Sequence, residues 1–366
     1  MMERTLLIQP RDPAIFRDGK PFTAGAPARS IPWPMPSAVI GAIRTRLGRL
    51  TDYDEETVKR LRKIEQCGPF LAAKTQGLYT LAFPAPADAV AFEAEDGKLD
   101  VWPLRPERLV DGEGTDTPGG LPPVLMDRIE RDEKPVEMRP FWLAKWTMEW
   151  LAASGGVAVR RSPAEIGLGG LSRQRRIHVK IDSGSQAAEK GMLFGTEGLE
   201  FESCAICSRI RYGEDEKWAA LESLAPIGAE RRLAHWWEQS IDWPAAPEWL
   251  AESRLIRLQL VTPGSFDEGW KPGWMTHGTP PGLDGLELSL VAAAVPRAAA
   301  LSGWDLTKRG KRGEKATRFL APAGSVYFCE VKRGDPRRLW LRSIADQEQD
   351  RRDGFGLVLC GVWQWR

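Results

Sequence analysis

Three histidines, His178, His235 and His277, are the side chains best suited to acid–base chemistry near neutral pH. No two of them are close in sequence, so a catalytic pair would need a tertiary contact that the sequence does not reveal. The sequence has no Walker loop, no nucleophile elbow and no pair of carboxylates in a recognisable motif. We therefore predict no catalytic residue and no cofactor, and we expect each histidine to be structural or to face solvent.

Cys204 and Cys207 have the Cys-x-x-Cys spacing of some metal sites. A zinc ion needs two further ligands, and the sequence offers no matching Cys or His pair. The surrounding segment reads as a strand, which places the two sulfurs on opposite faces. We predict no metal ligand and two small buried side chains. The five cysteines form no disulfide framework and the N-terminal residues lack a signal-peptide core, so we expect a cytoplasmic protein without a membrane span.

Positive charge is clustered, although Lys and Arg number 51 and Asp and Glu 50. An RNA site would have to come from such clusters rather than from the net charge. Between Val157 and Lys180 six basic residues accompany one acid, Glu165, and a second basic cluster occupies residues 308–318. Glycines are interleaved in both clusters, and glycine lets a backbone approach a phosphate that Arg can contact bidentately. The clusters favour RNA binding, with solvated surface loops as the alternative.

The elements that must position these residues alternate between helical and strand patterns. Apolar residues at helical spacing predict a helix over 37–50, with Ser37 as its N-cap. A second helix is predicted over 140–154, where three tryptophans at four-residue spacing form a stripe that we expect in the core. Residues 216–253 are expected to be mostly helical, and Asp96-Gly97 predicts the turn of a β-hairpin.

The order of strands and helices predicts an α+β protein with two βαββαβ domains and long loop insertions, the first of them the proline-rich stretch 10–36. We expect an N-terminal domain over 1–200 and a C-terminal domain over 201–366. The boundary stays open, as does whether the final strand completes a sheet that both domains share.

Several segments, in this order along the chain, resemble the RAMP superfamily of CRISPR proteins, and within it the third subunit of the type III-B (Cmr) effector complex. Each segment is unspecific alone, but the shared order is specific and spans nearly the whole chain. The segments are Arg17–Phe22, Pro32–Pro36 with Ser37–Arg44, Ile177–Asp182 with Gly191–Phe194, Pro226–Arg232, Thr262–Phe266 with Gly269 and Trp270, Ser302–Asp305, Pro322–Tyr327 and Gly354–Gly356.

The resemblance implies two ferredoxin-like (RRM-like) domains and a subunit that binds the 5′ handle of the CRISPR RNA without nuclease activity of its own. It also implies contacts with the large (Palm-domain) subunit and with the first backbone subunit of the complex. The sequence departs from the family pattern at Lys20, where Arg is expected, and at Ala229, where Gly is expected. Lys20 keeps the charge but loses the bidentate geometry of Arg.

We predict that the proline-rich loop and the N-terminal end of the 37–50 helix form one wall of an RNA site, and that the segment 173–180 forms the opposite wall. The predicted RNA-binding residues are Arg17, Lys20, Arg29, Ser37, Arg44, Arg173, Arg175, Arg176, His178, Lys180, Gly354, Phe355 and Gly356. A secondary set is Arg160, Arg161, Arg231, Arg232, Lys308, Arg309, Lys311 and Arg312. Carboxylate pairing is the alternative role for Arg231 and Arg232.

Two other functions stay open at this point. The chain could be a RAMP endoribonuclease that processes precursor CRISPR RNA, with His178 as the one reasonable general acid or base. It could also be a protein scaffold with little RNA contact, whose basic clusters are solvated loops.

Overall fold

A computed structural model describes residues 1–17, 29–49, 54–127, 133–156, 158–216, 218–302 and 316–366. These residues form two compact units, each assembled from three stretches of chain. Unit 1 comprises Met1–Gly77, Gly170–Ser240 and Ala300–Arg318, and unit 2 comprises Leu78–Gly169, Ile241–Ala299 and Phe319–Arg366. The units therefore interleave along the sequence, unlike the two consecutive domains, 1–200 and 201–366, expected above.

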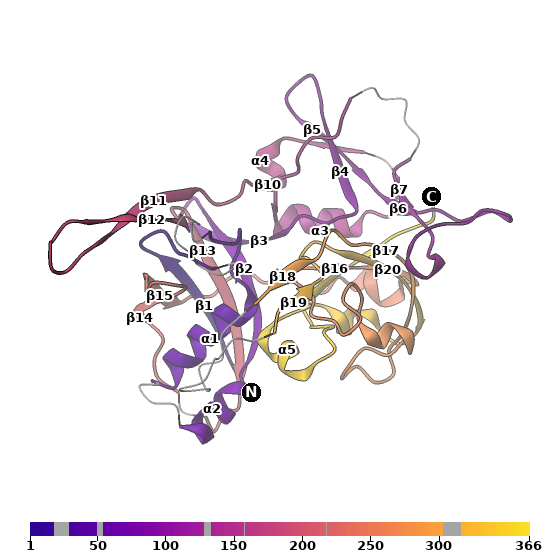
Figure 1. The fold of residues 1–366 in the computed structure, drawn as a ribbon. Helices are drawn as coiled ribbons and strands as arrows, with labels where there is room; N and C mark the ends of the chain where they lie inside the picture. The colour runs from indigo at the N-terminus through magenta and orange to yellow at the C-terminus, as the bar shows by residue number, and fades with distance from the viewer. Residues whose placement is uncertain (18–28, 50–53, 128–132, 157, 217, 303–315) are drawn as a thin grey trace. The chain divides into compact units, whose positions relative to one another are not determined.

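Unit 1 is built on antiparallel strands in the order β2-β13-β1-β15-β14 (Figure 1). In the sheet, β1 lies between β13 and β15, which is the place of the first strand in a βαββαβ domain. Along the chain, however, the described residues that connect β13 to β15 contain no helix. The elements are β1 (Met2–Pro10), α1 (Pro36–Leu47), α2 (Glu55–Arg62), β2 (Glu65–Thr75), β11 (Arg173–Ile181), β12 (Ala188–Leu199), β13 (Cys204–Tyr212), β14 (Ser223–Pro226) and β15 (Leu233–Glu238).

Helix α1 confirms the predicted helix over 37–50 within a few residues at each end. Its buried side chains recur at helical spacing, as Val39, Ile40, Ile43 and Leu47, and the helix contacts β2. The predicted N-cap is wrong: Met35 is the N-cap and Pro36 the first helical residue, because proline has the right φ and needs no amide donor there.

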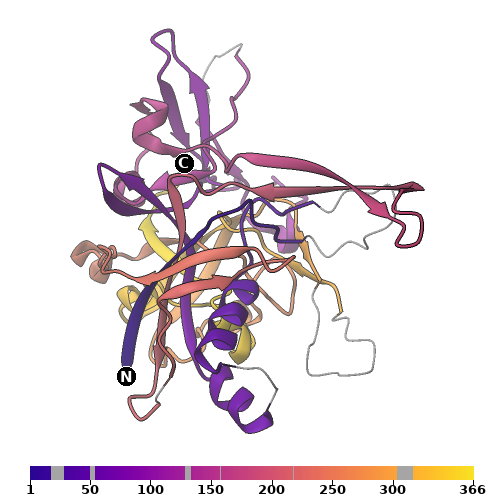
Figure 2. The same cartoon turned by 90° about the vertical axis from the view of Figure 1, so that its left-hand side faces the viewer.

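Strands β11 and β12 form a long two-stranded hairpin that extends away from the rest of unit 1 (Figures 1 and 2). Side chains of a strand alternate between its two faces, and both faces of the outer part are solvated: Ile177 on one face is 81% exposed, and its neighbour Arg176 on the other face is also exposed. Because the hairpin packs little apolar surface, its stability must come from the strand ladder and from pairs between opposite side chains.

Unit 2 contains a four-stranded antiparallel sheet with the order β17-β20-β16-β21. The arrangement is the same as in unit 1, because β16, the first of these strands along the chain, lies between the third, β20, and the fourth, β21. The α+β prediction is confirmed for the described residues. The sheet strands are β16 (Leu255–Leu260), β17 (Glu287–Ala294), β20 (Val326–Arg333) and β21 (Val358–Val362), and the helix α5 (Glu348–Asp353) precedes β21.

The other elements of unit 2 are further antiparallel strands and the helices α3 and α4. They are β3 (Leu78–Pro84), β4 (Ala89–Glu93), β5 (Leu99–Pro103), β6 (Arg105–Pro106), β7 (Val124–Leu125), β8 (Phe141–Leu143), α3 (Ala144–Ala152), β9 (Val159–Arg161), α4 (Pro163–Ile166) and β10 (Gly167–Leu168). The short strands β18 (Ala299–Leu301) and β19 (Arg318–Leu320) pair with each other. In the described residues, 3₁₀ turns cover Pro118–Gly120, Glu248–Glu252, Gly273–Thr276 and Pro336–Leu339. None of the helices in the described residues is long and apolar enough to cross a membrane.

The tryptophan stripe is buried, as predicted, although its first member lies on a strand. Trp142 belongs to β8, whereas Trp146 and Trp150 lie on α3. Their rings form a cluster with centroids 5.4–6.1 Å apart, and each side chain is at most 3% exposed. The helix begins only at Ala144, since residues 141–143 pair with β3 instead.

A buried ion pair fixes α3 to the sheet of unit 2. Arg257 on β16 donates to Asp88 over 2.7 Å, and both side chains are at most 3% exposed. Trp150 Nε1 donates to the same carboxylate over 3.2 Å, and Arg257 also donates to the carbonyl oxygens of Trp150 and Ala153. The carboxylate is therefore satisfied by two donors, which offsets the cost of burying two charges.

The prediction of a mostly helical segment over 216–253 is wrong. The described residues contain the strands β14 and β15 and one 3₁₀ turn. Side chains along Leu233–Glu238 alternate between exposed and buried positions, which is the period of a half-buried strand. Three prolines, at 226, 244 and 247, further prevent a continuous helix.

Candidate nucleic-acid interface

The basic residues of strand β11 lie on two opposite faces of the hairpin rather than on one wall. Arg173 and Arg175 share one face, and Arg176, His178 and Lys180 share the other, because neighbouring residues of a strand alternate. The sequence prediction treated this segment as a single surface. The structure instead offers positive charge on both sides of a thin, solvated ribbon.

On the first face, two arginines hold one carboxylate. Arg173 and Arg175 each form an ion pair with Glu197 of β12, the second over 3.0 Å. The Glu197 side chain is only 5% exposed, whereas those of Arg173 and Arg175 are 39% and 79% exposed. Burial raises the pKa of Glu197, but hydrogen bonds from Arg173 and Arg175 outweigh it and bring the pKa below the usual range. Arg175 keeps most of its surface available to a ligand.

Arg173 also joins the hairpin to the end of the proline-rich loop. Its Nη1 donates to the carbonyl oxygen of Ser30 over 3.0 Å. Arg17 pairs with Ser30 in an isolated β-bridge, and Arg29 is the exposed neighbour of Ser30. Three of the predicted RNA-binding arginines, Arg17, Arg29 and Arg173, therefore gather around one buried serine of unit 1.

The second face combines a cation with an aromatic pair. The ring of His178 stacks on Phe194 of β12, with centroids 5.2 Å apart and an angle of 16°, and His178 Nε2 lies 3.0 Å from Thr196 Oγ1. Arg176 Nε donates to the Gln174 side chain over 2.5 Å, and Lys180 forms an exposed ion pair. Phe194 and Glu197 were absent from the predicted site, because their positions opposite β11 depend on a strand register that local sequence does not specify.

Two residues of the first predicted wall have roles in the fold. Arg44 Nη2 donates to the carbonyl oxygens of Arg62 and Ile64, over 3.3 and 2.8 Å, which ties α1 to the start of β2. Ser37 is the second residue of α1 rather than its N-cap. Their predicted contacts with RNA stay predictions.

Several of the secondary arginines have carboxylate partners. Arg160 contacts Asp100 over 2.7 Å, and Arg161 contacts Glu149 over 3.4 Å, both in unit 2. In unit 1, Arg232 contacts Glu230 over 2.8 Å, which is the alternative role that the sequence left open for it, and Arg231 is exposed in a turn with positive φ.

The segment Gly354–Phe355–Gly356 lies inside unit 2. All three residues are buried, and Gly354 ends α5 in the left-handed conformation, with φ of 87°. A Cβ on Gly356 would lie 3.1 Å from the backbone nitrogen of Ala345, so the glycine allows two backbone segments to approach. The structure thus explains these glycines by helix termination and packing, and their predicted RNA contact stays untested. The predicted residues Lys20, Lys308, Arg309, Lys311 and Arg312 lie outside the described part of the chain.

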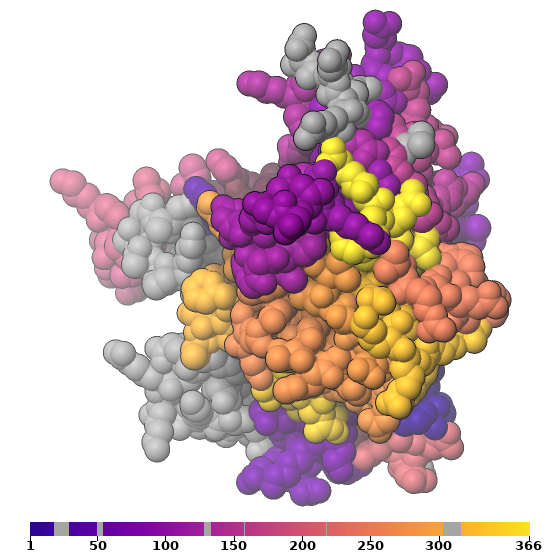
Figure 3. All heavy atoms as spheres, turned by 90° about the vertical axis from the view of Figure 1, so that its right-hand side faces the viewer, coloured from indigo at the N-terminus to yellow at the C-terminus, as the bar shows by residue number. Residues whose placement is uncertain are grey.

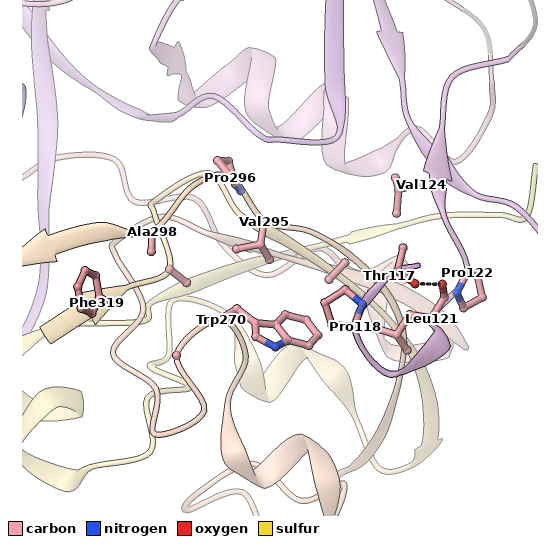
Figure 4. A pocket seen from close by; sticks show the side chains of 13 residues that line it. Thr117, Pro118, Leu121, Pro122, Val124, Trp270, Val295, Pro296, Ala298 and Phe319 are labelled. Atoms are coloured by element: carbon pink, nitrogen blue, oxygen red, sulfur yellow. Dashed lines mark hydrogen bonds between the residues drawn. The ribbon is translucent and has the colours of Figure 1, made fainter. Parts of the chain in front are cut away.

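Unit 2 contains an apolar cavity of about 340 Å³ under the loop that follows β6. Figure 3 shows this loop, in purple, lying on the orange segment of the unit. Trp270, Val295 and Phe319 face Pro118 and Leu121 across the cavity, and the loop is braced by a hydrogen bond from Thr117 Oγ1 to the Leu121 carbonyl oxygen (Figure 4). No charged side chain is among the described residues that line it, so it is unsuited to binding phosphate.

No group of three or more His, Cys, Asp or Glu side chains that could hold a metal ion occurs in the described residues. Cys204 and Cys207 are both buried, as predicted. Burial raises the pKa of the Cys204 thiol, which keeps it protonated near neutral pH.

A family profile described as CRISPR-associated protein (Cas_Cmr3) matches residues 6–363. None of the curated proteins matches the sequence. Among solved structures, the chain is similar to a chain of the type III-B Cmr-beta complex bound to cognate target RNA and AMPPnP. The sequence identity is 14%, the match covers 89% of this chain and 86% of that chain, and the TM-score is 0.47. It is also similar to a chain of the Csm3–Csm4 subcomplex of a type III-A interference complex, with 11% identity, 99% of both chains covered and a TM-score of 0.37.

Proposed function

We propose that this chain recognises the 5′ handle of the CRISPR RNA without cutting it. The proposal proceeds from the family: the chain belongs to the Cas_Cmr3 family of CRISPR-associated proteins and is a subunit of a type III-B effector complex. The proposal gives the chain the role of a non-catalytic RNA-binding subunit. It anchors the handle next to the large (Palm-domain) subunit and also contacts the first backbone subunit. Each unit is taken to be a ferredoxin-like domain from which one helix has been lost or shortened.

The observation that carries the proposal is the basic surface of unit 1. Arg17, Arg29 and Arg173 gather around Ser30, and the adjoining hairpin exposes Arg175 on one face and Arg176 on the other. Guanidinium groups can contact the phosphates of a single strand bidentately. A chain whose formal charge is only +1 needs such a local concentration of arginine to bind RNA.

Single-stranded RNA suits this surface better than a duplex. Unstacked bases can lie on aromatic or guanidinium planes, and the hairpin offers both in the stacked rings of His178 and Phe194 and in Arg176. In this role His178 contacts a base and transfers no proton.

Binding of the purified protein to labelled guide RNA tests the proposal. The protein, with and without its large partner subunit, is mixed with guide RNA that carries or lacks the 5′ handle. We expect handle-dependent binding without cleavage. Cleavage that is lost on His178→Ala would instead support the processing nuclease, and binding that ignores the handle, even with the partner present, would support the scaffold.

A further inference from the structure

A polar cavity of about 380 Å³ lies in unit 1 where the end of β1 meets the base of the hairpin. Its size is within the range of small-ligand sites, which begins at about 300 Å³. The strands β1 and β15, the first residues of β11 and the turn between β12 and β13 all contribute to it. The lining residues are Gln9, Pro10, Arg11, Asp12, Pro13, Gln174, Glu200, Phe201, Glu202 and His235.

The hydrogen bonds of the two glutamines make this cavity rich in acceptors. Gln9 Nε2 donates to the carbonyl oxygens of Phe201 and Glu202, over 3.0 and 3.2 Å, which leaves Gln9 Oε1 as the group that can accept. Gln174 Nε2 donates to the Glu200 carboxylate over 3.3 Å. Asp12 and Glu202 add two exposed carboxylates. The complementary ligand therefore presents N–H donors.

Glu200 is held in place by a chain of hydrogen bonds that starts on the hairpin. Arg176 Nε donates to Gln174 Oε1 over 2.5 Å, and the amide of Gln174 in turn donates to Glu200. The side-chain amide of Gln174 is thus oriented from both ends, which fixes the carboxylate before any ligand arrives. The same chain connects the cavity to the basic face that is proposed to bind phosphate.

His235 provides a flat surface at the cavity. It is the register partner of Gln9 across β1 and β15, so the two side chains project from the same face of the sheet. Its ring is exposed and stacks on Trp237, with centroids 4.9 Å apart and an angle of 26°. A planar group that enters the cavity can therefore stack on an aromatic ring that is itself supported.

From these contacts we propose that the cavity binds one unstacked base of single-stranded RNA, and that it selects bases with an exocyclic amino group. This inference rests on the proposed RNA-binding function. Adenine, cytosine and guanine offer amino donors to the carboxylate and to Gln9 Oε1, and guanine offers two adjacent donors to one carboxylate. Uracil turns carbonyl oxygens toward the same acceptors. The three carboxylates outnumber the one arginine of the lining, Arg11, so the cavity disfavours a phosphate.

The test removes amino groups from the RNA one at a time. Guanosine is replaced by inosine, adenosine by purine riboside and cytidine by its 4-deamino analogue at each handle position, and binding of the full-length protein is measured at equilibrium. We expect one position at which loss of the amine weakens binding about tenfold, as for a hydrogen bond to a charged group. That penalty should shrink in the Glu200→Gln variant, and His235→Ala should weaken binding of every RNA.

The matched control is Glu222→Gln, which removes an exposed carboxylate of unit 1 outside the cavity. The inference would be overturned if binding depends on the handle but Glu200→Gln changes the loss of affinity at no analogue position. The proposed function would then still stand. An absence of RNA binding would overturn both. Loss of partner-subunit binding in Glu200→Gln without any RNA present would show that the cavity takes a basic protein side chain instead.

Discussion

Replacing Arg173 and Arg175 by glutamine separates their contribution to the fold from their contribution to RNA binding. Both arginines neutralise Glu197, whose side chain is 5% exposed. Without them the carboxylate keeps its desolvation cost and loses its ion pairs. We expect the double variant to destabilise the hairpin by about 1 kcal/mol, which is below the range for buried hydrogen bonds to charged groups because both arginines are partly solvated.

Hydrogen exchange is the assay for this local effect, because a hairpin that extends from its unit can open without global unfolding. Amides of Arg173–Ile181 and Ala188–Leu199 should exchange about fivefold faster in the double variant. The folded pKa of Glu197 is below its usual 4.5, so its contribution to stability is present above that value and is lost as the pH falls through the folded pKa. The wild-type hairpin should therefore lose protection in acid, and Glu197→Gln should remove that dependence.

The triple variant, with Glu197→Gln added, removes the carboxylate that the double variant leaves without its ion pairs, so that any remaining change in affinity reports on RNA binding. Each phosphate contact on a single strand contributes about 0.7 to the slope of log affinity against log salt, so loss of two contacts lowers the slope by about 1.4. A triple variant with wild-type exchange, wild-type affinity and an unchanged slope would refute the reasoning, because the two arginines would then serve Glu197 alone.

Three further predictions concern the fold of the two units. Asp88→Asn leaves Arg257 buried without a carboxylate and should cost about 3–5 kcal/mol of unfolding free energy in a denaturant titration; a loss below 1 kcal/mol would show that water reaches the pair. Burial raises the pKa of Cys329 to about 12, so a thiol reagent at pH 8 should modify it only after unfolding, and rapid labelling of the native protein would contradict this. Gly354→Ala puts a Cβ on a residue with φ of 87° and should destabilise the protein by about 1–2 kcal/mol. Gly41→Ala, in a helix with open space around the glycine, should stabilise the protein slightly. Thermal melts of both variants measure these effects.

Features set by local periodicity could be predicted from the sequence. The helix over 37–50, the hairpin turn at Gly97 and the buried tryptophan stripe all appear close to their predicted places. Each depends on the spacing of apolar residues within about fifteen positions or on one turn dipeptide. The wrong prediction for 216–253 has the same origin, since short strands between prolines give a weak period.

Features that depend on pairing between distant segments could not be predicted. The register that sets Arg175 opposite Glu197 and His178 opposite Phe194 is formed by strands that a turn separates, so the sequence showed a basic cluster but not its two faces. The interleaving of the two units has the same cause, because Cys204–Tyr212 completes the sheet that Met2–Pro10 begins. The cavity at His235 likewise combines four segments that no local motif connects.

Crosslinking within the assembled complex tests most directly whether this subunit binds the handle. Photoreactive nucleotides are placed at each handle position, and the crosslinked peptides are identified by mass spectrometry. The account predicts crosslinks from handle nucleotides to peptides that contain Arg173–Ile181 or the residues around Ser30. Handle crosslinks that fall only on other subunits would contradict it.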